Sequence, residues 1–173
     1  MGDVAMTVPV LKIITATYPQ LRITVLTRKL FAPFFDDITN VQVHLADVNG
    51  RHKGPLGLYR LSNEIQALGI EAVADLHDVL RSQVVRKLLS WKSIPYQTID
   101  KGRPEKAALV RKENKELKQL KTSHQRYADV FAALGYPIDI KHQLTLAFPE
   151  ISTNTSELLN LLCPSNKEYS HWI

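Results

Sequence analysis

The apolar residues of this chain alternate between the two-residue period of a strand and the 3.6-residue period of a helix. Four runs have strand length and are rich in β-branched or other apolar residues: 22–27, 41–45, 71–76 and 94–99. Helical patterns cover the segments around them: 4–17, 28–35, 55–68, 79–91, 104–120 and 123–134. Because strands that alternate with helices form right-handed βαβ units, we expect an α/β fold with a parallel sheet flanked by helices.

The pattern weakens toward the C-terminal end of the chain. Gly135 ends the last clear helix, and proline interrupts the remainder three times, at Pro137, Pro149 and Pro164. Only a short strand-like run at 143–148 and a short helix at 156–162 are expected there. We therefore divide the chain into a domain, residues 1–136, and a linker, residues 137–173.

Length and composition fit one ordinary domain, because 173 residues with 45% hydrophobic side chains can build a core. The longest apolar stretches fall well short of the roughly 20 residues of a membrane span, and no signal peptide is visible. These features predict a cytoplasmic protein. The single cysteine, Cys163, has no second thiol for a disulfide and no metal-ligand spacing, so we expect it to be structural and expect no metal site.

The positive charge of the chain, +5 overall, is concentrated in one segment. Residues 101–126 have a net charge of +6, from three acidic residues and nine basic ones: Lys101, Arg103, Lys106, Arg111, Lys112, Lys115, Lys118, Lys121 and Arg126. Such a stretch suits anionic lipid headgroups, a phosphorylated sugar or nucleic acid, although a solvated helix face is the simpler alternative. Nucleic acid is the least favoured partner, because the segment has no interleaved aromatic residues and no recognised nucleic-acid motif.

The chain opens on a glycine and an aspartate directly before its first helix. In a doubly wound sheet, the first turn between strand and helix lies at the carboxyl end of a central strand, where ligands bind. Gly2 would let the backbone approach a ligand closely, and the Asp3 carboxylate would be free to reach it. The alternative is that Asp3 caps the helix. No strand precedes this turn, so we expect the first strand of the sheet to be missing.

Four sequence blocks agree in order and spacing with one enzyme family. They are Met1-Gly2-Asp3-Val4 followed by Thr7 and Pro9, segment 75–82 (DLHDVLRS), segment 100–103 (DKGR) and segment 125–131 (QRYADVF). In this combination, the chain resembles the ADP-heptose:lipopolysaccharide heptosyltransferases of glycosyltransferase family 9 over residues 1–136.

The resemblance implies a GT-B enzyme, in which a Rossmann-like acceptor-binding domain is followed by a Rossmann-like donor-binding domain. This chain would be the acceptor half, truncated at both ends, and inactive alone because the donor could not be positioned. The implied reaction is inverting, metal-independent transfer of heptose from ADP-heptose, a donor substrate, and no cofactor is implied. The implied acceptor is the lipopolysaccharide core or a related anionic glycolipid, which predicts peripheral association with the cytoplasmic face of the inner membrane.

The resemblance also indicates site residues. Asp3 resembles the family's catalytic base, which takes the proton of the acceptor hydroxyl. Arginine and lysine suit the carboxylates and phosphates of such an acceptor, so the expected acceptor contacts are the opening turn and several basic residues. They are Gly2, Thr7, Arg51, Lys53, Arg81, Lys101, Arg103, Lys106 and Arg111.

Several nearby residues have two interpretations. Arg81 could pair with Asp78, three residues before it, and not with an acceptor. His77 is either a polar core residue, the favoured interpretation, or a substrate donor. Asp75 ends a strand and could cap the next helix. The helical neighbours Tyr127 and Phe131 are expected to pack and not to stack on a ligand.

Two other functions stay open. A stand-alone module could hold an anionic glycolipid without catalysis. A nucleic-acid binder would use segment 101–126 and would lose affinity steeply as the salt concentration rises.

Overall fold

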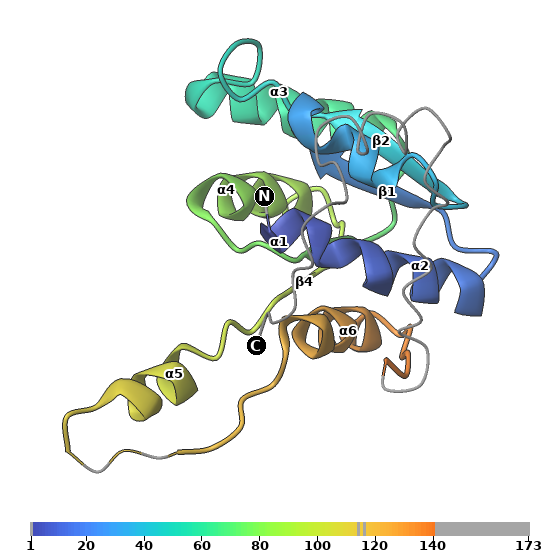
Figure 1. Ribbon diagram of the computed structural model, residues 1–173. Coiled ribbons are helices and arrows are strands. Elements are labelled where there is room, and N and C mark those ends of the chain that lie inside the picture. Colours follow the sequence, from blue (N-terminus) through green and yellow to red (C-terminus); the bar gives the residue numbers. More distant parts are fainter. Residues whose placement is uncertain (1, 114, 116, 141–173) are drawn as a thin grey trace, which may run out of the picture.

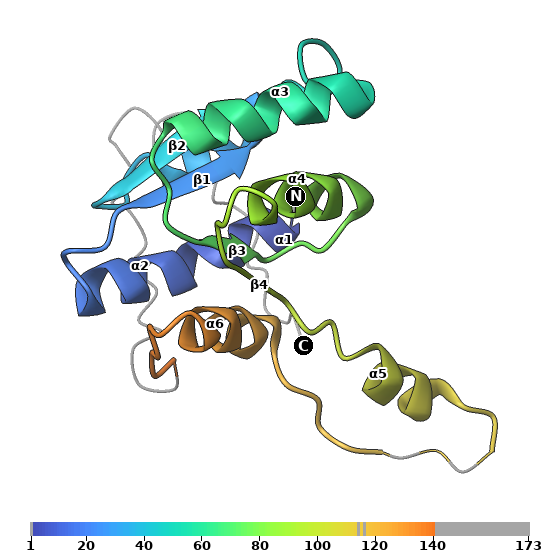
Figure 2. The same ribbon diagram turned by 180° about the vertical axis from the view of Figure 1, so that it is seen from behind.

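The computed structural model describes residues 2–113, 115 and 117–140. Its elements, in chain order, are α1 (Gly2–Ala5), α2 (Thr7–Thr17), β1 (Ile23–Thr27), the 3-10 helix η1 (Lys29–Phe35), β2 (Val41–Leu45), α3 (Gly54–Ala67), β3 (Val73–Asp75), α4 (Leu80–Ser90), β4 (Tyr96–Thr98), α5 (Arg103–Val110) and α6 (Ser123–Ala133). Figures 1 and 2 show α2 beside α6, and α3 beside α4. The expected elements at 143–148 and 156–162, and Cys163, lie outside the described residues.

The strands are parallel, as expected for an α/β fold. β1 pairs with β2 in the register Ile23 to Val41, and β3 pairs with β4 in the register Val73 to Tyr96. Within the described residues these are two separate two-stranded sheets, and no ladder joins β1 to β3. Each pair has a helix between its two strands, η1 between β1 and β2 and α4 between β3 and β4, as in an α/β fold.

The two larger of three apolar clusters among the described residues hold the layers together. In the larger cluster, α2 and α6 pack with η1 and the β1–β2 pair around these buried side chains: Val10, Leu11, Ile14, Phe35, Ile38, Tyr127 and Phe131. The packing expected for Tyr127 and Phe131 is thus confirmed. In the second cluster α3 packs against α4 through Leu58, Leu61, Ile65, Val85 and Leu89. Burial of this kind is the main favourable contribution to folding.

The first helix is broken where one helix over 4–17 was predicted. α1 ends at Ala5 and α2 begins at Thr7. Pro9 explains the break, because a proline ring clashes with the carbonyl group four residues earlier, here that of Ala5. The break leaves Gly2 and Asp3 on a separate short helix.

The helix predicted over 104–120 is also shorter than expected, since α5 ends at Val110. The residues described between 111 and 122 form no helix. They are mostly charged and offer no apolar stripe to pack, and most helical stability in proteins comes from such packing. No helix in the described part of the chain is long and apolar enough to cross a bilayer.

α5 and the segment that follows it project away from the rest of the molecule (Figures 1 and 2). We call residues 103–113, 115 and 117–121 the basic arm. Its base is fixed by Arg126, which is 5% exposed and donates hydrogen bonds to the Asp100 carbonyl (2.9 Å) and the Glu105 carboxylate (2.7 Å). Gly102, beside this guanidinium, has a φ of +57°, and a Cβ atom there would overlap it. Glycine thus meets both the backbone and the space requirement.

Candidate functional site

Asp3 lies on α1 with its carboxylate in solvent. The side chain is 64% exposed, and the hydroxyl group of Tyr127 donates a hydrogen bond to the Asp3 carbonyl oxygen (3.3 Å). Burial raises the pKa of Tyr127, and the negative charge of Asp3 raises it further. The carboxylate makes no capping hydrogen bond within the described residues, so the capping interpretation of Asp3 is wrong.

Asp3 lies beside His77, whose Nδ1 is 3.9 Å from Asp3 Oδ2. The His77 side chain is 59% exposed. The favoured interpretation of His77 as a polar core residue is therefore wrong. The Asp3 carboxylate and the His77 imidazole thus share one exposed surface.

His77 is held outward by a turn that Asp75 stabilises at the end of β3. Asp75 Oδ1 accepts hydrogen bonds from the backbone N–H groups of His77 (3.0 Å) and Asp78 (2.7 Å), while Oδ2 accepts one from Arg86 (2.8 Å). The Asp75 side chain is only 4% exposed. Asp75 thus satisfies the turn before α4, whereas the helix itself begins with Ser82 Oγ accepting from the Val79 N–H (3.0 Å). Asp75 lies four residues before Val79, the N-cap position of α4, so the expected cap of this helix by Asp75 does not form.

Asp78 shares Arg86 with Asp75. Its Oδ1 accepts hydrogen bonds from Arg86 (2.9 Å) and Gln83 (3.0 Å), and these bonds hold the pKa of Asp78 below its usual value of 3.8. The Asp78–Arg81 pair considered from the sequence does not form. Asp78 precedes α4 and has a φ of +42°, so helical i,i+3 spacing does not apply to it. Lys101 donates to the carbonyl oxygen of Asp78 (3.1 Å).

A second polar cluster lies at the end of β2 and on α3. Glu64 contacts Arg51 (2.5 Å), His52 (3.2 Å) and His44 (3.3 Å). Burial would raise the pKa of Glu64, but the adjacent His52, then Arg51 and His44, outweigh it and keep the pKa below the usual 4.5. The Asp47 carboxylate stabilises the loop before α3, because it accepts hydrogen bonds from the N–H groups of residues 50 and 51.

The structure thus separates the expected acceptor residues into groups. Lys101 is joined to the Asp3 neighbourhood through Asp78 and His77. Thr7 donates its hydroxyl hydrogen to the Val4 carbonyl oxygen (2.7 Å), and Gly2 lies in α1. Arg51 belongs to the Glu64 cluster and has no contact with Asp3. The others are exposed, and their side chains form no hydrogen bond or ion pair with another described residue: Lys53, Arg81, Arg103, Lys106 and Arg111.

Sequence reasoning missed the supporting role of Arg86 and Arg126. Arg86 reaches back eleven positions to Asp75, and Arg126 reaches back to Asp100 and Glu105. The only available signal was the position of Asp75 at the end of a buried strand, because a buried carboxylate needs a partner such as an arginine. By its position in the sequence, Arg126 belongs with the other cations of segment 101–126. In the structure Arg126 is buried, so it does not belong to the exposed positive surface.

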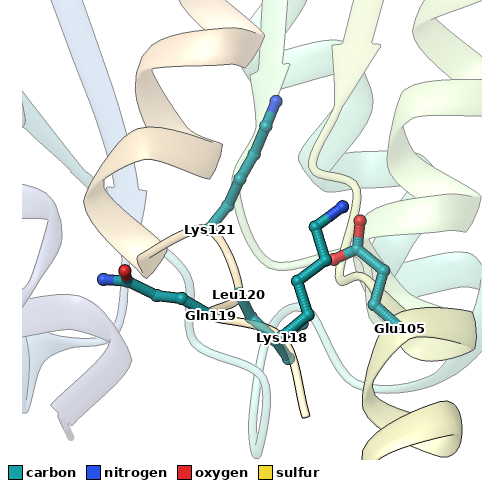
Figure 3. A pocket seen from close by; sticks show the side chains of 5 residues that line it. All are labelled: Glu105, Lys118, Gln119, Leu120 and Lys121. Atoms are coloured by element: carbon teal, nitrogen blue, oxygen red, sulfur yellow. The ribbon is translucent and has the colours of Figure 1, made fainter. Parts of the chain in front are cut away.

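A cavity of about 300 Å³ lies at the base of the basic arm and not at Asp3. It is lined by Glu105, Lys118, Gln119, Leu120 and Lys121. Figure 3 shows the Glu105 and Lys118 side chains extending toward each other, with Gln119 pointing away. Four of the five lining residues, all but Leu120, have charged or polar side chains. Among the described residues, no group of histidine, cysteine or acidic side chains is placed to hold a metal ion.

No protein-family model matches this chain, and no curated protein matches it. One solved structure does: the glycosyl transferase family 9 protein from Veillonella parvula DSM 2008, with a TM-score of 0.62 and 19% sequence identity. The match covers 94% of this chain and 46% of that protein, so the chain spans about half the length of its structural neighbour. The similarity shows a shared α/β fold.

Proposed function

We propose that this chain is the acceptor-binding half of a glycosyltransferase of family 9. The observation that carries the proposal is the exposed Asp3 carboxylate on a fold similar to that of a family 9 protein. Tyr127 holds the backbone of Asp3, while Asp75 holds His77 beside its carboxylate. A catalytic base must be held in place and must be accessible to the acceptor. The hydrogen bond from Tyr127 supports the first property, and the exposure of the Asp3 side chain supports the second.

In the proposed reaction, the acceptor hydroxyl attacks the anomeric carbon of a nucleotide-activated sugar. The new carbon–oxygen bond forms as the bond to the diphosphate breaks on the opposite face, which inverts the configuration. Asp3 accepts the hydroxyl proton, and the nucleoside diphosphate leaves with the bonding electrons. The positive charge that develops on the sugar ring favours a nearby carboxylate.

The proposal includes a donor and an acceptor. The donor is ADP-heptose, held by a further domain, and the acceptor is an anionic glycolipid of the lipopolysaccharide core type at the cytoplasmic face of the inner membrane. Lys101 donates to the carbonyl oxygen of Asp78, the residue after His77, and Arg103 and Lys106 follow it in the sequence on α5. Their positive charge complements acceptor phosphates.

The first test replaces Asp3 in the native protein that carries this chain. Asp3→Asn keeps the shape of the side chain but removes the base, and general-base catalysis contributes about 100- to 10,000-fold to a rate. We expect turnover with ADP-heptose and a deacylated core acceptor to fall in that range, with Asp37→Asn, an exposed carboxylate elsewhere, as control. Unchanged turnover in Asp3→Asn would exclude it as the base.

The second test measures acceptor binding. Arg103→Ala should weaken binding of a phosphorylated core oligosaccharide to the 173-residue chain by about tenfold, the loss of one charge-assisted hydrogen bond. Lys12→Ala, which removes an exposed cation from α2, is the matched control. If the two variants lose the same affinity, binding depends only on the net charge of the chain, and Arg103 is not an acceptor contact.

A further inference from the structure

The structure divides the cations of segment 101–121 into two groups. Lys101 donates to the Asp78 carbonyl oxygen, and Lys121 pairs with Asp129 (2.8 Å). The other six are exposed, and their side chains form no hydrogen bond or ion pair within the described part of the chain: Arg103, Lys106, Arg111, Lys112, Lys115 and Lys118. All six lie in the basic arm, where they outnumber the described acidic residues, Glu105 and Glu113.

Two large apolar side chains stand among these cations. Val110 is 78% exposed and Leu117 is 88% exposed. One exposed leucine needs no explanation. Here, however, both residues lie on a segment that projects from the molecule (Figure 2), so that no apolar surface of the fold covers them. Basic and aliphatic side chains thus occur together at the outermost part of the chain.

The arm is anchored at both ends. At its beginning, Arg126 binds the Asp100 carbonyl oxygen and the Glu105 carboxylate. At its end, Lys121 is ion-paired with Asp129 on α6. Both anchors belong to α6 and the loop before it, so the arm has a fixed origin on the body of the molecule. A projection that is anchored in this way can present its surface to a partner in one orientation.

We propose that the basic arm docks on an anionic lipid bilayer, with Lys and Arg at the headgroups and Val110 and Leu117 inserted at the acyl boundary. The charge complementarity and the two aliphatic side chains carry this assignment. Each basic residue near an anionic leaflet raises the affinity of a protein for the membrane about fivefold, and each buried methylene group raises it further.

A nucleic-acid partner fits the arm less well. Residues 101–121 contain no Phe, Tyr or Trp. Single-stranded nucleic acids bind through aromatic stacking in addition to charge, and an arm without aromatic residues lacks that contribution. The exposed side chains of Val110 and Leu117 would add no affinity for a phosphate backbone, whereas their burial in a lipid interface would strengthen binding.

This inference deepens the proposed function, because it names the surface that would bring a membrane-held acceptor toward Asp3. Its test does not use sugar transfer, so its failure and the failure of the proposed function are distinguishable. Co-sedimentation of the 173-residue chain with phosphatidylcholine vesicles, with and without phosphatidylglycerol, measures the partition coefficient. The same protein is titrated with a single-stranded oligonucleotide.

Two variants and two matched controls make the test specific. The triple variant Lys112→Gln, Lys115→Gln, Lys118→Gln removes three arm charges that are not among the expected acceptor contacts, and its control is Lys12→Gln, Arg22→Gln, Lys29→Gln on the body. Leu117→Asn removes the aliphatic side chain, and Leu56→Asn, on α3 and 84% exposed, is its control. Circular dichroism and thermal unfolding check that all variants fold.

We expect binding to the anionic vesicles that decreases with salt. The arm triple variant should weaken it about 100-fold and Leu117→Asn about tenfold, while the controls change it little. The proposal is overturned if wild-type protein does not bind anionic vesicles, or if the two triple variants lose affinity equally. It is also overturned if the oligonucleotide binds more tightly than the vesicles and Leu117→Asn leaves both affinities unchanged, because the arm would then be a nucleic-acid surface.

Discussion

Replacement of Asp75 tests whether the turn beside Asp3 is held as the structure indicates. The carboxylate is 4% exposed and accepts three hydrogen bonds, two from backbone N–H groups and one from Arg86. Asp75→Ala leaves these donors without an acceptor, and breaking a buried ion pair commonly costs about 3–5 kcal/mol. Arg86 retains Asp78 and is 17% exposed, so we expect the lower end, about 3 kcal/mol.

Asp75→Asn separates the turn from the ion pair. The amide oxygen still accepts from the two N–H groups, but the negative charge that faces Arg86 is lost. A hydrogen bond to a charged group contributes about 1.5–3 kcal/mol, so Asn should cost about 2 kcal/mol and always less than Ala. For a chain of this size, each kcal/mol lowers Tm by about 2–4 °C.

Urea unfolding followed by circular dichroism measures both variants at pH 7. Asp37→Ala, which removes an exposed carboxylate next to η1, is the control and should stay within about 0.5 kcal/mol of wild type. If Asp75→Ala is as stable as Asp37→Ala, Asp75 is not the support of the turn. If Asn costs as much as Ala, the charge opposite Arg86 accounts for the whole effect, and the role of the two N–H groups is refuted.

Two further predictions concern Gly102 and Glu64. Gly102→Ala should destabilise the fold by at least about 1 kcal/mol more than Gly69→Ala, because both have positive φ but only the Cβ at Gly102 meets Arg126. Equal losses in urea unfolding would show that Arg126 moves aside freely. Because the folded pKa of Glu64 lies below its usual 4.5, its contribution is present above pH 4.5 and is lost as the pH falls through the folded pKa. The stability difference between wild type and Glu64→Gln should therefore shrink between pH 6 and acidic pH, and a difference that does not change with pH would contradict this assignment.

Elements with local signals could be predicted closely from the sequence. Strand β2 was expected at 41–45 and is found at Val41–Leu45, and α3 agrees to within one residue at each end. A β-branched run, Pro55 at the helix start and Gly69 after its end are local features, and local features suffice for such segments. β3 and β4 are shorter than predicted, because a ladder extends only as far as a partner strand is present.

The candidate site residues stay a prediction, and the residues that support them were not predicted. Asp3 and Lys101 could be named because their residue types and positions matched a family pattern. The hydrogen bond from Tyr127 to Asp3 joins residues 124 positions apart, and Arg86 reaches Asp75 across a turn and most of a helix. Neither contact has a period or spacing that a single sequence displays. His77 was misplaced because the chemistry of a lone histidine does not indicate its burial.

Helix α6 holds two distant parts of the molecule through neighbouring residues. Arg126 donates hydrogen bonds to the base of the basic arm, and the next residue, Tyr127, donates one to the backbone of Asp3. The first turn of this helix is itself capped by Thr122, whose hydroxyl oxygen accepts from the Gln125 N–H (3.2 Å). Damage to that cap would displace Asp3 and the arm together. A mutational scan would then find that Thr122 affects the position of both, although its side chain contacts neither.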